Sequence, residues 1–386
     1  MTTQALAVNN QLFRAKRIGL FIGLFGAATA AFLWWVGNPS LFLHSYLAAF
    51  LFWAALAVGS LGLALIGNVV SSNWAEVARP YLTAAARTLP LMMVFFIPIA
   101  LSLQTLYPWA DGARVLHDEI LEKRVAYLNS TFFLVRSCAY FMVFFVMQWA
   151  LLPQKLGQAP TDAMRRKSTW ALVIYGLVIS FAGFDWVMSL NPHWYSNVFG
   201  VIYGVGQLLE SMAFLIAMII YLKMWVAYSE LETQTLQDMA SLLLVFVLFW
   251  TYVNFGQFLI IWSGQLPEEV AWYHERNQGG WSWISYGLLF LHFLFPFFLL
   301  LFRTIKRAPY KLFLVCCLLL VMRIVDIIWN VFPTYQNSLW ISPWPFLSAL
   351  IGLGGFWMIL YLSQFRFEVL APTRPHSGSA KEGHHE

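Results

Sequence analysis

Long apolar runs dominate this sequence and restrict it to one class of fold. A membrane-spanning helix needs about 20 consecutive, mainly apolar residues. The runs here are continuous rather than alternating in short segments, which argues against a membrane β-barrel. Of the whole chain 60% is apolar and only 11% is charged, whereas a soluble domain is about 25% charged. The sequence therefore predicts an all-α polytopic membrane protein with ten transmembrane helices, at residues 18–36, 43–70, 89–106, 130–152, 168–190, 197–226, 239–263, 281–302, 311–332 and 342–364.

The basic residues are distributed unevenly between the two sides of the predicted membrane. Arg136 and Arg323 lie within predicted helices, and most other basic residues lie on the side that carries the N-terminus. Short loops rich in lysine and arginine stay on the cytoplasmic side. We therefore expect a multi-pass protein of a bacterial cytoplasmic membrane with both termini in the cytoplasm. The outer loops then hold only four of the 23 basic residues, Arg114, Lys123, Arg124 and Arg276.

Two polar ends flank the predicted membrane domain. Residues 1–17 form a cytoplasmic N-terminal segment, and residues 18–364 form the ten-helix domain. Residues 365–386 are mostly polar, so we expect a disordered cytoplasmic tail. The net charge of +5 comes mainly from the inner loops and the tails, where it sets topology, and it does not indicate nucleic-acid binding.

The cysteines and histidines exclude most bound redox cofactors. Cys138, Cys316 and Cys317 lie in apolar runs, and no CxxC pattern supports a disulfide framework, an iron–sulfur site or covalent haem. Only His292 lies deep in a predicted helix, whereas transmembrane haem needs paired histidines. We therefore predict no metal site, no covalently bound cofactor and no catalytic residue of a redox reaction. Any redox role requires either a diffusible carrier, such as a quinone or menaquinone, or the cofactors of another subunit. Lipids are the other expected ligands.

Ionisable residues inside spanning helices are costly, so each one is a functional candidate. Arg136 and Asp185 lie at similar depths near the outer ends of two consecutive helices. We expect them to form an ion pair. That pair either is structural or lines a polar cavity in the outer leaflet.

A second polar group lies in the sixth to ninth predicted helices. Arg323 and Asp326 are three residues apart and can pair on one helix face. Four consecutive helices thus offer polar groups in the outer half or at the centre of the bilayer. We expect them to form part of a proton route; the alternative is a polar network that only fixes helix register. The proton-transfer candidates are Glu210, His292, Arg323, Asp326, Asn254 and Gln257.

Asp185 and His193 lie eight residues apart and could be mistaken for a catalytic pair. The Asn191–Pro192 step between them predicts a tight outer turn, because proline cannot continue the preceding helix. We therefore expect Asp185 below the membrane surface and His193 on the surface, as two separate features.

Two motifs resemble a known family. The stretches "FDWVMSLNPHWYSNVFGV" at 184–201 and "LPEEVAWYHERNQGGW" at 266–281 are similar to those of the NrfD-like membrane subunits of bacterial alternative complex III. The resemblance covers roughly residues 15–365. It implies two four-helix bundles, formed by helices 2–5 (43–190) and 6–9 (197–332), with helices 1 and 10 peripheral.

The same resemblance implies a place in a respiratory or photosynthetic electron-transport complex. Such a complex oxidises quinol from the membrane pool and passes electrons to an acceptor. The implied partners are an ActC-like sister membrane subunit and, on the outer side, iron–sulfur and multihaem cytochrome c subunits. The implied position of a quinone pocket is the outer end of helices 2–5, where Arg136, Asp185 and His44 lie.

Three functions stay open at this stage. The favoured one is a subunit that supports assembly and conducts protons, because no hydrophobic slot for a quinone ring is visible in the sequence. The second is direct binding and oxidation of quinol. The third is a secondary transporter, which should show broken helices near the midplane, whereas the Asn191–Pro192 break lies at a helix end.

Overall fold

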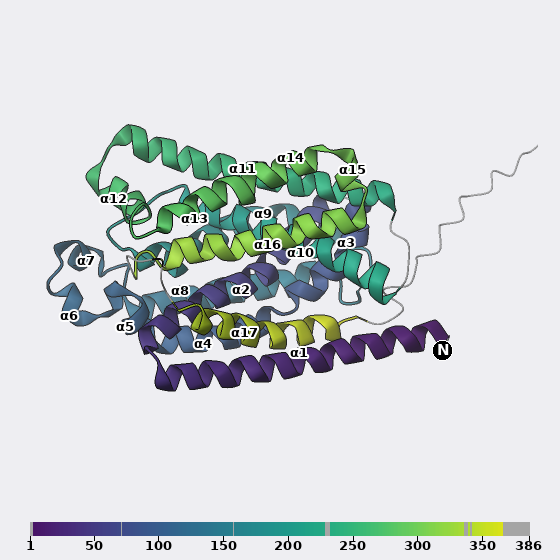
Figure 1. The fold of residues 1–386 in the computed structure, drawn as a ribbon, viewed down its shortest axis with the longest axis horizontal. Coiled ribbons are helices and arrows are strands. Elements are labelled where there is room, and N and C mark those ends of the chain that lie inside the picture. Colours follow the sequence, from purple (N-terminus) through teal and green to yellow (C-terminus); the bar gives the residue numbers. More distant parts are fainter. Residues whose placement is uncertain are drawn as a thin grey trace, which may run out of the picture.

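The computed structural model describes residues 3–70, 72–156, 158–227, 232–335, 339 and 342–365. Every regular element within these residues is helical, and ten helical segments are long and apolar enough to cross a membrane (Figure 1). The predicted all-helical fold with ten such segments is therefore confirmed. The predicted disorder of the tail concerns residues that, apart from Phe365, lie outside those described.

The spanning segments are single helices, or helices interrupted within the membrane. The uninterrupted ones are α1 (Thr3–Val36), α2 (Pro39–Val70), α8 (Ser130–Leu151), α9 (Asp162–Trp186), α11 (Thr233–Gly264), α16 (Pro309–Val331) and α17 (Trp344–Ser363). The others are α3 (Asn73–Ala86) with α4 (Leu89–Leu101), α10 (Phe199–Ile220) with η3 (Tyr221–Val226), and α13 (Trp281–Gly287) with η4 (Leu288–Leu294) and α14 (Phe295–Leu301). The short α5 (Leu103–Leu106) follows α4.

Several helices extend beyond their predicted boundaries, and the two largest differences lie before residues 18 and 89. Helix α1 begins at Thr3 rather than near residue 18, because the preceding residues include neither proline nor glycine. The predicted inner loop before residue 89 contains α3 (Asn73–Ala86), a helix in which every residue from Ala78 to Ala86 is buried. Hydropathy alone misses both, since charged residues do not stop a helix; they only lower its mean hydropathy.

The eighth spanning segment is interrupted by a π-helical turn, η4, that contains His292. Pro296 explains the interruption. Its ring has no N–H to donate and would collide with the carbonyl group of residue 292 in a regular α-helix. The wider π turn relieves that collision, and such turns are frequent at functional sites.

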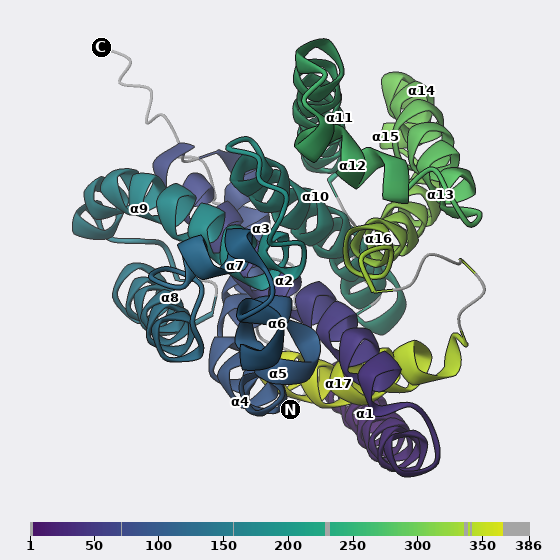
Figure 2. The same cartoon turned by 90° about the vertical axis from the view of Figure 1, so that its left-hand side faces the viewer.

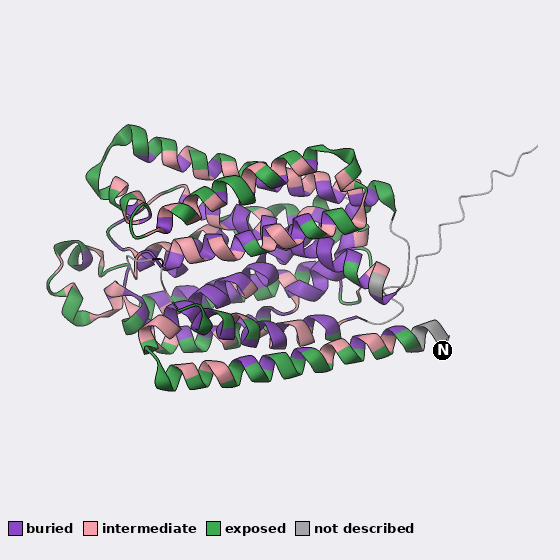
Figure 3. Cartoon of the chain, in the orientation of Figure 1, coloured by how far each residue is buried: buried purple, intermediate pink, exposed green. Residues whose placement is uncertain are grey.

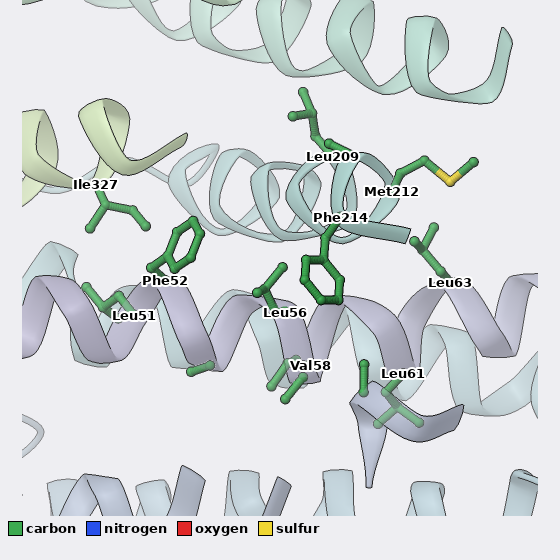
Figure 4. Packing of buried hydrophobic residues seen from close by; sticks show 14 of the residues in the cluster. Leu51, Phe52, Leu56, Val58, Leu61, Leu63, Leu209, Met212, Phe214 and Ile327 are labelled. Carbon is green, nitrogen blue, oxygen red and sulfur yellow. The ribbon is translucent and has the colours of Figure 1, made fainter. Parts of the chain in front are cut away.

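Helices α2 and α10 are the most buried spanning helices and form the centre of the molecule (Figures 2 and 3). Leu56 of α2 and Phe214 of α10 are among the side chains that fill the space between them (Figure 4). Helices α4, α8 and α9 pack on one side of this pair, and α11, α14 and α16 pack on the other. Side chains of α2 and α10 therefore face both halves of the molecule.

Helix α1 packs mainly against α17, at the edge of the molecule (Figure 2). The two backbones approach closely at Gly26 and Gly352: a Cβ atom on Gly26 would lie 2.4 Å from the backbone nitrogen of Gly352. Small residues permit this close packing of helices within a membrane. Most of α1 faces away from the protein.

Short helices cover one end of the molecule, at the left of Figure 1, which we call the loop end. They are α6 (Gly112–Val115), α7 (Glu119–Arg124) and α12 (Pro267–Glu275). Directly after α12, the buried Arg276 donates to the backbone oxygens of Trp329 at 3.2 Å and of Asn330 at 3.1 Å. Burial lowers the pKa of Arg276 to about 9, so the side chain is still a cation at neutral pH. It ties the loop after α12 to the end of α16.

Candidate functional site

Arg136 of α8 and Asp185 of α9 form a buried bidentate ion pair. Arg136 Nε and Nη2 lie 2.7 and 2.9 Å from the two carboxylate oxygens. Tyr140 donates to the same carboxylate at 2.6 Å, and Arg136 Nη1 donates to the backbone oxygen of Tyr127 at 2.9 Å. The ring of Phe132 lies 4.3 Å from the guanidinium carbon. The predicted pair is confirmed.

The pair has the form of a structural brace between α8 and α9. Both carboxylate oxygens and all three guanidinium nitrogens of Arg136 bind protein groups. A bidentate pair of this kind is strong and fixes the geometry of both side chains. The arrangement leaves little capacity for a quinone oxygen.

His44 lies in a different place from this brace. Its Nδ1 is 2.8 Å from the backbone oxygen of Ser40, and its ring stacks on Tyr335 with the centroids 4.2 Å apart. It lines a separate pocket of about 210 Å³, which we call the His44 pocket. The sequence placed His44 beside Arg136 and Asp185 on depth alone, and depth does not determine which way a helix face points.

His193 is also separate from Asp185. Its Nε2 lies 2.8 Å from a carboxylate oxygen of Asp118, the residue that caps α7, and half of its side chain is exposed. The interpretation of Asp185 and His193 as two features is confirmed.

A second charged cluster lies at the centre of the molecule, between α10 and α16. Arg323 Nε is 3.6 Å from Glu210 Oε2, and Arg323 also forms an ion pair with Asp326. Glu210 is completely buried, and the other two are at most 5% exposed. Gly206 makes the room for the guanidinium, since a Cβ atom there would lie 2.6 Å from Arg323 Nη2. The central cluster thus joins two acids through one cation.

His292 belongs to the surroundings of this cluster. It is fully buried in the π turn and close enough to Arg323 to interact with its charge. The ring of Trp250 packs against it with centroids 4.2 Å apart. Neither ring nitrogen of His292 and neither carboxylate oxygen of Glu210 has a hydrogen-bond partner among the described residues. The cluster therefore contains two groups with free capacity to exchange protons.

The two amides predicted for the proton route lie in different places. Gln257 accepts from Ser196 at 2.8 Å and donates to Tyr273 at 3.3 Å, which places it at the loop end. Asn254 donates to the backbone oxygen of Trp250 and lines a cleft that Asp326 also reaches. Asn254 therefore lies beside the cluster, whereas Gln257 does not.

Two amides that the sequence argument passed over lie beside the central cluster instead. Gln207 is three residues before Glu210 and 1% exposed, and its amide has no hydrogen-bond partner among the described residues. Asn330 donates to the backbone oxygen of Asp326 at 2.8 Å and to its side chain at 3.3 Å. Helical spacing from the two acids is the signal that could have found both.

A lateral cleft of about 720 Å³ opens beside the cluster. It lies between α11 and α13, at the place where α11 diverges from the neighbouring segment (Figure 2). Aromatic side chains form most of its wall, including Trp250, Tyr273, Tyr286 and Trp329, and Asp326 reaches it from α16. We call it the aromatic cleft; hydropathy alone did not reveal it.

The described residues contain no group of three or more histidine, cysteine, aspartate or glutamate side chains placed to hold a metal ion. Comparison of the sequence with known protein families finds no family whose model matches, and comparison with curated proteins finds no match.

Proposed function

We propose that the chain is an integral membrane subunit of a quinol-oxidising complex, of the NrfD-like ActF type, and that its central cluster conducts protons. The single observation that carries the proton role is the burial of Glu210 beside Arg323 and Asp326 at the core of the molecule. The complex itself is proposed on the two motifs at 184–201 and 266–281.

The chemistry of the cluster suits proton transfer. An ionised acid buried alone in apolar surroundings is costly, and a neighbouring cation offsets that cost. Arg323 can stabilise a negative charge on Glu210 or on Asp326. A proton can therefore leave one acid while the other acid stays in contact with the Arg323 cation. The neutral and charged forms of both acids then become accessible without an unpaired buried charge.

The alternative to proton conduction is that the central cluster is a polar network whose only role is to fix helix register. Such a network gains stability when its polar groups are satisfied, because an unpaired buried group is costly. The Arg136–Asp185 brace meets that description. The central cluster does not, since the oxygens of Glu210 and the nitrogens of His292 lack hydrogen-bond partners in the described part of the chain. The contrast between the two sites favours a functional role for the second.

The packing supports the proposed NrfD-like arrangement. Helix α2 contacts α4, α8 and α9, helix α10 contacts α11 and α16, and α14 packs between α11 and α16, while α1 and α17 pair at the edge. On this proposal the loop end faces the outside of a bacterial cytoplasmic membrane and both termini lie in the cytoplasm. The loop end would then meet the iron–sulfur and multihaem cytochrome c subunits, and an ActC-like subunit would lie beside the chain.

The aromatic cleft favours direct quinol binding as a second candidate function. Its volume and aromatic walls suit a planar ring, and the carboxylate of Asp326 could accept a hydrogen bond from a quinol hydroxyl. A menaquinol analogue should then bind the purified chain and protect it thermally, and Tyr286→Ala should weaken that protection. Protection that is unchanged in Tyr286→Ala would rule this cleft out as the site.

The experiment that tests the proton role uses the full chain reconstituted in liposomes with an imposed pH gradient. We expect Glu210→Gln to abolish most proton flux through the protein, because the amide cannot release a proton. The matched control is Glu268→Gln, the same substitution at an exposed position of α12. Equal flux in the two variants, at equal thermal stability, would refute the proton role. Co-purification with a multihaem cytochrome c tests the complex independently.

A further inference from the structure

A small cavity lies directly beside the central cluster, on the side of the loop end. Its volume is about 30 Å³, and its polar wall is formed by Tyr203, Gln207, Arg323, Asp326 and Asn330. A water molecule needs about 10–15 Å³ and two to four polar partners. The cavity therefore has the room and the partners for one or two water molecules, and we call it the inner cavity.

Gln207 gives the strongest reason to place water there. Its side chain is 1% exposed, lines the inner cavity, and has neither a donor nor an acceptor for its amide among the described residues. A buried amide that lacks hydrogen-bond partners at both ends is costly to the folded state. A water molecule in the inner cavity would remove that cost and would bridge Gln207 to the charged cluster.

The His44 pocket provides a polar route from the loop end towards the inner cavity. Ser40, His44 and Tyr335 form part of its wall, and the exposed residues Thr105 and Arg114 stand at its mouth. Its volume of about 210 Å³ admits several water molecules.

The two cavities are neighbours along three separate segments. Helix α2 lines the pocket at His44 and the inner cavity at Leu51, a separation of about 10 Å along the helix. The turn after α9 contributes Leu190 to the pocket and Val187 to the cavity. On α16, Val331 lines both and is fully buried. Apolar side chains around Val331 thus form a thin partition between the two.

We propose that the His44 pocket and the inner cavity together form the water-filled path by which protons pass between the loop end and the Arg323–Asp326 pair, with Val331 as the partition. The inference rests on the proposed proton role and adds the direction of access and the residues of the path. It gives His44 and Gln207 a place in the same route. The aromatic cleft is a poorer path, because its wall is almost entirely apolar.

Cysteine accessibility tests the path without measuring proton flux. The full chain is expressed in membrane vesicles with its three native cysteines, Cys138, Cys316 and Cys317, replaced by alanine. Single cysteines are then introduced at Val331 and at Ile327, which lines the inner cavity. Silver ion is the probe, since it is small enough for a cavity of this size and reacts with thiols in contact with water.

Two control variants allow the labelling rates to be interpreted. Thr105→Cys, at the mouth of the His44 pocket, reports full access and shows which face of the vesicle carries the loop end. Ile328→Cys lies at a similar level of α16 but lines neither cavity. We expect Val331→Cys and Ile327→Cys to react from the side that labels Thr105→Cys, at a rate at least about tenfold above that of Ile328→Cys.

The outcomes separate the path from the proton role. Reaction of Val331→Cys and Ile327→Cys at the rate of Ile328→Cys, while Thr105→Cys reacts fast, would overturn the path and leave the proton role of Glu210 standing. Fast reaction at both positions supports the path. If Glu210→Gln then leaves proton flux unchanged, the proton role fails while the hydrated path remains.

Discussion

The guanidinium group of Arg323 rests against Gly206 of the neighbouring helix, where a side chain would collide with it: a Cβ atom would lie 2.6 Å from Nη2 and 2.8 Å from Cζ. The central cluster therefore depends on a position that carries no functional group. Glycine at 206 lets α16 bring its cation to the level of Glu210, one turn further along α10.

Gly206→Ala should displace Arg323 and weaken its contact with Glu210. Overpacking of a tight interface costs about 1–3 kcal/mol, so we expect a lower melting temperature and slower proton flux in liposomes. The matched control is Gly176→Ala on α9, where an added Cβ meets no atom within 4 Å. That control should be neutral or stabilising by up to about 1 kcal/mol, because alanine favours helix. Equal behaviour of the two variants would show that Arg323 is not held by Gly206.

Substitutions in the Arg136–Asp185 brace should lower the stability of the protein without a specific loss of proton flux. Removal of one partner from a buried ion pair costs about 3–5 kcal/mol, so Asp185→Asn and Arg136→Gln should both lower the melting temperature of the detergent-purified protein. Lys123→Ala breaks the exposed pair with Glu119 and serves as the control, with no measurable change expected. A brace variant that melts like the natural protein but loses proton flux would contradict the structural role.

Acid should loosen α7 through Asp118. Although desolvation opposes the shift, hydrogen bonds from the backbone N–H groups of Leu121 and Ile120 and the charge of His193 lower the pKa of Asp118 below 3.8. A carboxyl with a lowered pKa stabilises the fold above its unfolded pKa, and that stability is lost as the pH falls through the lowered value. The amides of Ile120 and Leu121 should therefore lose protection as the pH drops below 3.8.

Hydrogen exchange, corrected for the intrinsic pH dependence of the exchange rate, measures this loss. Asp118→Ala should lack the protection of α7 at every pH, because the cap is gone. Protection that is independent of pH in the natural protein would contradict the assignment of Asp118 as the titrating cap.

The two ion pairs could be predicted from the sequence, but the cavities around them could not. Arg136 and Asp185 could be paired because they lie at one depth on consecutive helices, and Arg323 and Asp326 because three residues separate them on one helix face. Gln257 shares the depth of the cluster yet bonds to Ser196, because depth does not determine the direction of a side chain.

The aromatic cleft is a second feature that could not be predicted from the sequence. It exists because α11 diverges from α13, and that divergence is a matter of helix packing, which hydropathy does not encode. The inner cavity is similarly formed by side chains from four segments, α2, the turn after α9, α10 and α16. The π turn at His292 was readable in principle, since Pro296 lies four residues further along the same apolar run.

The central claim is that Glu210 exchanges its proton inside the membrane, and infrared difference spectroscopy of the reconstituted full chain after a pH jump tests it most directly. The account predicts a carboxyl C=O band that changes with pH, shifts in D₂O, and is absent from Glu210→Gln but present in Glu268→Gln. A band of the same size in Glu210→Gln would contradict the claim.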